Sequence, residues 1–495
     1  MAALTQIVWL LRIFILRIDF PMDIEWLEGH SLEEAWRSTH AGEPLYGDRT
    51  LGHQTQIYPP LYFMVVGVLG RVVGLDYATG RSVSIVAFLA GCGAVLHVVM
   101  AHAKDRKTGV VVGLVAVAAI CAGFPVVYGW YDIARVDSMA IALVIGAGAV
   151  VSGASPPTTR RAVVAGALLA MAVYTKQTTV VFVPWLAAFV FVRSKRAGLW
   201  LAGVFTVLCG VALVALQLAT HGWFLRWMTL AAAQSMEIQR LGDGQLSILK
   251  FAPYLPLYVL LIPFMAGRRW LTPTTALWCG LFASAVPASF LPFLKVGGAP
   301  NNFIAIVFFT PPAVLLAVLD CVDGPARGWK WRPAALAAFL ALASAYLVLA
   351  LYPHDLYVPT VPQRAAARSL DALVASLHGG VVIPSHPFLA RRHDREGRQV
   401  LNMGYIELDT AHVPGVHVKD DLEHIGAAWL ILTDPGGDVW IRDQVAGLYD
   451  LDCRIDPGFA SYATLQSNPR LLYRASRARG GSSQQDVPVC APADR

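Results

Sequence analysis

Residues 197–219, AGLWLAGVFTVLCGVALVALQLA, form a run in which no side chain is charged. A helix needs about 20 apolar residues to cross the roughly 30 Å of hydrocarbon in a bilayer, and this run is long enough. Similar runs recur as far as about residue 352. The chain of 495 residues is 56% hydrophobic and 15% charged, with a mean hydropathy of +0.54, whereas soluble domains carry about 25% charged residues. The sequence therefore predicts an all-α polytopic membrane protein.

Short basic clusters separate alternate apolar runs. RSKR precedes the quoted run at 193–196, and HAKDRK occupies 102–107. Cytoplasmic loops carry an excess of Lys and Arg, so we expect these connections in the cytoplasm and the intervening ones outside. The net charge of +6 comes from such clusters and indicates topology, not a nucleic-acid partner. The other clusters are Arg160–Arg161, Arg268–Arg269, and Arg327 with Lys330 and Arg332.

The run at 58–75, YPPLYFMVVGVLGRVVGL, fits this alternation only if it does not cross the membrane. Its Pro-Pro start and internal Arg71 suit a helix lying on the outer surface. The alternative is that it crosses and the N-terminus is outside. We favour the first arrangement, because Arg12 and Arg17 in the short first run argue for an N-terminus inside. It predicts about eleven spans in a transmembrane domain of residues 1–352, with an outer interfacial helix in a first extracytoplasmic loop at 20–75.

The composition becomes polar after residue 352. Strand-like runs at 380–384, 428–433 and 470–474 follow a helix-like stretch at 362–377. We expect a small extracytoplasmic α/β domain at 353–475 and a disordered tail at 476–495. Cys453 and Cys490 lie in this part of the chain. They either pair, if it faces an oxidising compartment, or remain thiols.

Charged side chains gather at the outer ends of the predicted spans. The stretch PMDIEWLEGH, residues 21–30, places three carboxylates directly after the first span. Charges at membrane depth are costly, so they tend to be paired, hydrated or functional. Several outer connections that supply acids and bases to one face therefore indicate an extracytoplasmic active site. The residues concerned are Asp23, Glu25, Glu28, Asp132, Arg135, Asp137, Lys176 and Lys295.

Several motifs follow one another along residues 1–350. The acidic turn precedes EEAWRSTHAGEPLY (33–46) and YPPLYF (58–63), and RVDSMAIAL (135–143) and YTKQTTVVF (174–182) come later. This order resembles the GT-C superfamily of membrane glycosyltransferases. The nearest groups are the bacterial relatives of protein mannosyltransferases and aminoarabinose lipid A transferases, glycosyltransferase families 39 and 83.

The resemblance implies a hexosyl- or pentosyltransferase of the bacterial inner (cytoplasmic) membrane. Such an enzyme moves a sugar, with inversion, from a polyprenyl-phosphate-linked donor to an extracytoplasmic glycan, lipid or protein acceptor. The donor, the acceptor and membrane lipids are the expected partners. Two or three carboxylates would either hold Mg²⁺ or Mn²⁺ or act without a metal.

A carboxylate is expected to accept the proton of the attacking acceptor hydroxyl. Glu28 stands nine residues before Arg37, at the register of the family's acid, although Gly29 occupies the position where a second acid often sits. Asp23 and Asp137 are the further catalytic candidates.

A fixed cation is expected to stabilise the departing phosphate. Lys176 matches the family's lysine, and Arg135 and Lys295 are further candidates for donor-phosphate binding. Where some relatives carry a lysine before Pro-Pro, this chain has Tyr58, so one phosphate contact is missing there. Contacts to acceptor or substrate are expected from Glu25, Trp26 and Asp132.

Other classes of protein fit parts of the pattern. A lipid-linked glycan polymerase or ligase would use a similar donor. A secondary transporter places its charged groups near the midplane of two related halves, whereas this chain shows one charged face and no internal repeat.

Overall fold

A computed structural model describes most of the chain. The described residues are 1–40, 44–48, 56–253, 255–256, 271–323, 332–393, 397–410, 417–433, 438–455, 469–476 and 489–490. Some sequence predictions fall elsewhere. The end of the apolar run near 257–267, the basic clusters at 268–269 and 327–330, and most of the tail at 476–495 lie outside the described residues.

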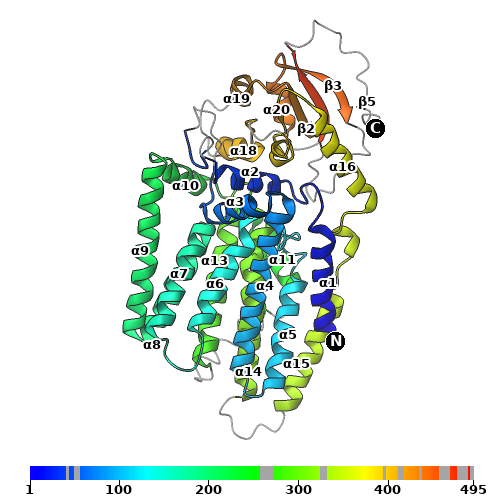
Figure 1. Ribbon diagram of the computed structural model, residues 1–495. Helices are drawn as coiled ribbons and strands as arrows, with labels where there is room; N and C mark the ends of the chain where they lie inside the picture. Colours follow the sequence, from blue (N-terminus) through cyan, green and yellow to red (C-terminus); the bar gives the residue numbers. More distant parts are fainter. Residues whose placement is uncertain are drawn as a thin grey trace.

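A bundle of helices forms the larger part of the molecule (Figure 1). Several bundle helices begin where a polar side chain accepts the backbone N–H three residues on, which satisfies an otherwise unpaired donor. These caps are Asp76, Asp105, Thr158, Ser194 and Thr272. The bundle helices are α1 (Ala2–Arg17), α4 (Tyr77–His102), α5 (Arg106–Ala122), α6 (Val136–Val151), α7 (Thr159–Thr175), α8 (Val183–Arg193), α9 (Lys195–Ala219), α11 (Leu241–Phe251), α13 (Pro273–Phe293), α14 (Ile304–Asp323) and α15 (Arg332–Leu349).

Four described helices are long and apolar enough to cross a membrane, or five if one bent pair counts as a single span. The four are Tyr77–His102, Lys195–Ala219, Pro273–Phe293 and Pro300–Val322, and the bent pair is Leu336–Leu349 with His354–Ser376. The remaining apolar helices are shorter. The structure thus confirms a mostly helical fold with several membrane-compatible helices, and the count of about eleven spans stays a prediction.

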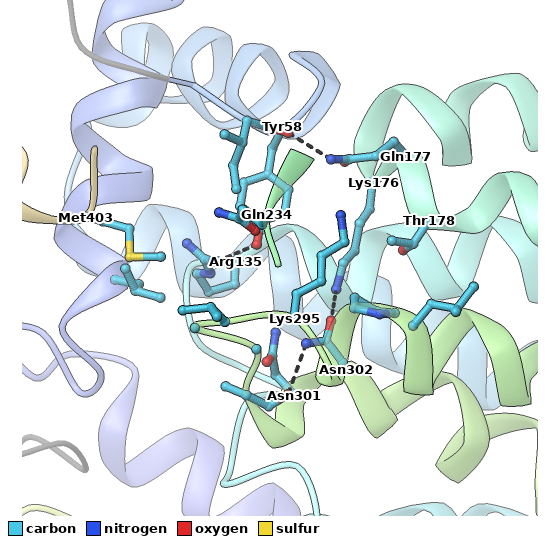
Figure 2. A pocket seen from close by; sticks show the side chains of 18 of the residues that line it. Tyr58, Arg135, Lys176, Gln177, Thr178, Gln234, Lys295, Asn301, Asn302 and Met403 are labelled. Atoms are coloured by element: carbon cyan, nitrogen blue, oxygen red, sulfur yellow. Dashed lines mark hydrogen bonds between the residues drawn. The ribbon is translucent and has the colours of Figure 1, made fainter. Parts of the chain in front are cut away.

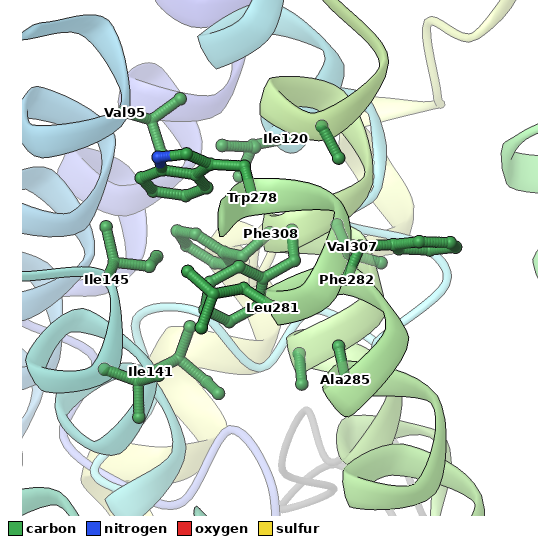
Figure 3. Packing of buried hydrophobic residues seen from close by; sticks show 14 of the residues in the cluster. Val95, Ile120, Ile141, Ile145, Trp278, Leu281, Phe282, Ala285, Val307 and Phe308 are labelled. Atoms are coloured by element: carbon green, nitrogen blue, oxygen red, sulfur yellow. The ribbon is translucent and has the colours of Figure 1, made fainter. Parts of the chain in front are cut away.

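Aromatic and branched side chains fill the bundle interior (Figure 3). Trp278 on α13 is fully buried, and its indole N–H donates to the Ser152 hydroxyl at 3.1 Å. Phe308 on α14 packs edge-on against Phe88 of α4, with ring centroids 5.5 Å apart. This core fixes the helix ends from which the site is built.

Three short helices lie at the upper end of the bundle in Figure 1: α2 (Leu27–Arg37), α3 (Leu61–Val73) and α10 (Trp223–Ala233). Helix α3 falls inside the run at 58–75 and has 13 residues, which span only about 20 Å. It packs closely on α2, because Gly67 leaves room there for the backbone carbonyl of Ala35.

An α/β unit lies beyond α2 and α3, at the same end of the bundle (Figure 1). Its five-stranded sheet has the order β1-β2-β4-β3-β5, with antiparallel pairing on both sides of β4 and parallel pairing at both edges. The helix and the three strands expected from the sequence are confirmed, whereas β3 and β5 were not anticipated. The helices are α16 (Val361–Ser376), α17 (Pro387–Arg391), α18 (Asn402–Thr410), α19 (Val418–Ile425) and α20 (Val439–Gln444), and the strands are β1 (Val381–Val382), β2 (Trp429–Thr433), β3 (Tyr449–Ile455), β4 (Pro469–Ala475) and β5 (Val489–Cys490).

Of the two states considered for Cys453 and Cys490, the structure has the disulfide. It joins β3 to β5, at the edge of the sheet.

Candidate active site

A cavity of about 450 Å³ lies where the upper bundle ends, α2 and the α/β unit meet. Its wall is largely apolar, with Ala288 and Leu291 of α13 on one side and Leu401 and Met403 of the α/β unit on another. Three cationic side chains and one carboxylate line the same space. They are Arg135, Lys176, Lys295 and Glu34. The cavity therefore combines an apolar wall with a strongly positive interior.

Lys176 is held at the junction between α7 and the 3-10 turn Gln177–Phe182. Its Nζ donates to Asn302 Oδ1 at 3.0 Å (Figure 2). The same Nζ donates to Asp137 Oδ1 at 2.7 Å. Asn301 also donates to Asp137 Oδ1, at 3.2 Å. Asp137, a candidate catalytic acid from the sequence, thus orients the lysine and does not itself line the cavity.

Arg135 and Lys295 reach the same cavity as Lys176 (Figure 2). The Arg135 guanidinium donates to the Ser31 hydroxyl at 3.2 Å and to the Tyr58 hydroxyl at 3.4 Å, and it lies 5.3 Å from the Tyr58 ring centroid. Tyr58 therefore positions a cation where some relatives of the GT-C type supply a lysine. Burial lowers the pKa of Lys295, which follows α13. The structure brings together all three residues predicted to bind phosphate.

Glu34 is the only carboxylate among the described residues that line the cavity. It lies on α2 with His30 and Leu27, which are four and seven residues earlier and so share its face of the helix. Burial raises the pKa of Glu34 to about 7, while the nearby Gln56 and Arg135 lower it. The residue stands in the motif EEAWR and was not among the site residues expected from the sequence. Its helical spacing from Leu27 and His30 was the signal that could have found it.

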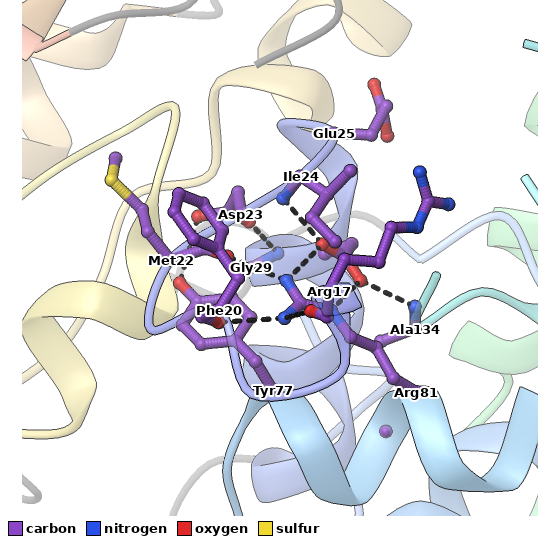
Figure 4. A network of polar contacts seen from close by, with 12 residues as sticks. Arg17, Phe20, Met22, Asp23, Ile24, Glu25, Gly29, Tyr77, Arg81 and Ala134 are labelled. Carbon is purple, nitrogen blue, oxygen red and sulfur yellow. Dashed lines mark hydrogen bonds and ion pairs between the residues drawn. The ribbon is translucent and has the colours of Figure 1, made fainter. Parts of the chain in front are cut away.

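Glu28 lies outside this cavity. Its hydrogen-bond partners Arg81, Ile24 and Ala134 belong to a buried polar network at the turn before α2 (Figure 4). Arg81 donates to both of its oxygens, at 3.0 and 2.7 Å, and both side chains are fully buried. The backbone N–H groups of Ile24 and Ala134 donate to the same carboxylate at 2.7 and 2.8 Å. These contacts hold the pKa of Glu28 below its usual value in spite of burial, with Arg81 the main favourable cause. This geometry favours a supporting role, and the prediction that Glu28 is the base remains untested.

Asp23 is also surrounded by donors (Figure 4). Its Oδ2 accepts from the Tyr77 hydroxyl at 2.9 Å and pairs with His386 Nδ1 at 2.8 Å, and its Oδ1 accepts from the backbone N–H of Gly29. A side chain at position 29 would collide with this carboxylate, since an added Cβ would lie 2.7 Å from Asp23 Oδ1. A glycine at position 29, where relatives often carry a second acid, is thereby explained.

The three residues expected to contact acceptor or substrate are placed apart from the cavity wall. Asp132 is fully buried and forms an ion pair with Arg17 of α1, whose Nε lies 2.5 Å from Asp132 Oδ2. Burial raises the pKa of Glu25 to about 8, and one of its oxygens accepts from the Leu27 N–H at 3.0 Å. Trp26 packs edge-on against His30, with ring centroids 5.4 Å apart.

The described residues do not suit the divalent cation considered from the sequence. Among them, no three His, Cys, Asp or Glu side chains are placed to share a metal ion. Asp23 and Glu28 already accept several hydrogen bonds each.

Comparison with known proteins shows which class of protein shares this architecture. Residues 57–252 match the sequence model of Glycosyltransferase family 87. The fold is similar to that of ArnT from Cupriavidus metallidurans bound to undecaprenyl phosphate, with a TM-score of 0.57 at 14% identity over 97% of this chain and 99% of that one. The oligosaccharyltransferase AglB from Archaeoglobus fulgidus, in complex with an inhibitory peptide and a dolichol-phosphate, matches 86% of this chain and 69% of its own at 9% identity and a TM-score of 0.42. No curated protein sequence matches the chain.

The family model and the similarity in fold to ArnT confirm the resemblance to the GT-C superfamily of membrane glycosyltransferases. Within that class, the family model that matches the chain is that of family 87, a different group from families 39 and 83.

Proposed function

We propose that the protein transfers a sugar from a polyprenyl-phosphate-linked donor to an acceptor hydroxyl in this cavity. The observation that carries the proposal is one space holding three cations, a carboxylate with a pKa near 7 and a largely apolar wall. The cations suit the donor phosphate and the apolar wall suits the start of its prenyl chain. The undecaprenyl phosphate bound to ArnT, a protein of the same fold, supports this class of donor.

Glu34 is the base in this proposal. It takes the proton of the acceptor hydroxyl while the acceptor oxygen bonds to the anomeric carbon and the bond from that carbon to the phosphate oxygen breaks. A base works best when its pKa lies near the operating pH, and burial brings the pKa of Glu34 to about 7. A single displacement of this kind inverts the anomeric carbon.

The cations stabilise the negative charge that develops on the departing phosphate. Lys176 is fixed by Asp137 and Asn302 before the donor arrives, so no reorganisation is needed as charge develops. Arg135 is held by Ser31 and Tyr58, and its Nε is buried with no hydrogen-bond partner among the described residues. We propose that the cavity, α2 and the α/β unit face the extracytoplasmic side of the bacterial inner membrane.

Transfer of a radiolabelled sugar from a polyprenyl-phosphate donor, with donor binding measured separately, tests the proposal. Glu34→Gln keeps the shape of the side chain but removes its basicity, so we expect transfer to fall about 10²–10⁴-fold while donor binding survives. The wild-type rate should rise as the pH passes through about 7, because only the ionised carboxylate accepts a proton. Normal transfer by Glu34→Gln would show that another group is the base.

A further inference from the structure

Helix α17 of the α/β unit contacts α2 through one buried ion pair. Arg391 Nε donates to Glu33 Oε2 at 2.8 Å and its Nη2 donates to Glu33 Oε1 at 2.5 Å, so the guanidinium spans both carboxylate oxygens. Both side chains are 1% exposed. The same guanidinium lies 3.8 Å from the ring centroid of Trp36, the next residue of α2 on that side.

A second contact holds the beginning of α2. His386, the residue before α17, pairs with Asp23 at 2.8 Å, and Asp23 accepts from the backbone N–H of Gly29 in the first turn of α2. The side chains of His386 and Asp23 are both fully buried. The α/β unit therefore contacts α2 at its first turn and again at Glu33.

Glu33 and Glu34 are neighbours in the chain but face different surroundings. Successive residues of a helix are turned by about 100°, so the side that carries Glu33 cannot also face the cavity. Gly29, Glu33 and Trp36 share the side held by α17, and Leu27, His30 and Glu34 share the side that lines the cavity. A rotation of α2 about its axis would move Glu34 out of the cavity.

We infer that Arg391 is a positioning residue which, by holding Glu33, fixes the rotation of α2 that aims Glu34 at the acceptor. This inference rests on the proposed role of Glu34 as the base. It gives the α/β unit a part in the reaction beyond its contribution of Leu401 and Met403 to the cavity wall.

The neighbouring residue provides a matched control. Arg392 is half-buried and donates to the Pro21 carbonyl at 3.0 Å and to Asp371 at 3.2 Å. Its ion pair is with Asp371, whereas Glu33 pairs with Arg391. Arg391→Gln should lower kcat by about 10²-fold, the cost of a misplaced reacting group, with the Kd for the donor unchanged. Arg392→Gln should leave kcat close to that of the wild type.

The pH dependence of kcat distinguishes a loss of positioning of Glu34 from a general loss of folded structure. Burial is the main cause of the raised pKa of Glu34, so a looser α2 should let water reach it and move the acid limb of the kcat profile to lower pH. In Arg391→Gln the limb should move, and in Arg392→Gln it should not. The double variant Glu33→Gln with Arg391→Gln leaves no unpaired buried charge, so it should fold even where the single variant does not, and it should show the same moved limb.

The outcomes distinguish this inference from the function on which it rests. If Glu34→Gln abolishes transfer but the Arg391 variants match Arg392→Gln in kcat and in the acid limb, the positioning role is wrong and the proposed function stands. If Glu34→Gln transfers normally, the proposed role of Glu34 as the base fails and the inference fails with it, whereas the proposed transfer activity itself fails only if the wild type does not transfer sugar.

Discussion

Glu28 and Glu34 stand six residues apart on the same short helix, yet their surroundings differ in kind. Arg81 and two backbone N–H groups stabilise the ionised form of Glu28. Glu34 forms no ion pair with another described residue, and burial favours its neutral form until the pH reaches about 7. Two carboxylates close together in the sequence therefore have different surroundings, which support the proposal that Glu34, and not Glu28, is the base.

Glu28→Gln should reduce stability more than it reduces chemistry. Removing one partner of a buried ion pair leaves the other charge uncompensated, at a cost of about 3–5 kcal/mol, and here that charge would be Arg81. Glu25→Gln is the matched control: with a pKa of about 8, Glu25 is already neutral at pH 7, so the change should alter stability little. Thermal unfolding of the purified variants measures both. If Glu28→Gln is as stable as Glu25→Gln and yet cannot transfer sugar, Glu28 is the base, as its position in the motif suggested.

At the scale of elements, the hydrophobic pattern predicts most helices of the bundle and the first elements of the α/β unit. The run at 197–219 lies within α9, and the strand-like stretch at 428–433 contains β2. Strand β3 was not predicted, because its sequence, YDLDCRI, does not alternate regularly between charged and apolar residues. Glu34 was not predicted for a different reason. The cavity that it faces is lined by residues of α13, by Lys176 and by Leu401, Met403 and Gly404, which no local sequence pattern brings together.

The disulfide predicts a redox-dependent stability of the α/β unit. It joins β3 to a two-residue strand across a sequence separation of 37, and closing a loop of that length stabilises a fold by about 2–4 kcal/mol. Reductant should therefore lower the unfolding temperature of the wild type. The double variant Cys453→Ser with Cys490→Ser should unfold at the temperature of the reduced wild type, with or without reductant. If the unfolding temperature of the wild type is the same with and without reductant, the disulfide contributes no stability.

At the scale of the whole molecule, the two ends of the bundle differ in character. The α4–α5 and α8–α9 turns, which carry the basic clusters at 102–107 and 193–196, lie at the end opposite the α/β unit (Figure 1). The cavity and its charged residues lie at the other end. This separation is the arrangement expected if the basic end is cytoplasmic.

Labelling of single cysteines in intact cells tests that orientation. Lys107→Cys should be protected from an impermeant thiol reagent and Asp355→Cys should react, on a background in which the native cysteines are replaced; both positions are exposed. Reaction at both positions from outside would contradict the alternation of basic connections, and with it the placement of 58–75 on the outer surface.

The central claim is that the cavity lined by Lys176, Arg135, Lys295 and Glu34 holds the phosphate of a polyprenyl donor. Photo-cross-linking tests it most directly, with a polyprenyl-phosphate analogue that carries its reactive group beside the phosphate and with mass spectrometry of the labelled peptides. We predict labels on the peptides that contain Lys176 and Asn301, and loss of most of that labelling in Lys176→Ala. Labels confined to other parts of the bundle, or equal labelling of wild type and Lys176→Ala, would contradict the account.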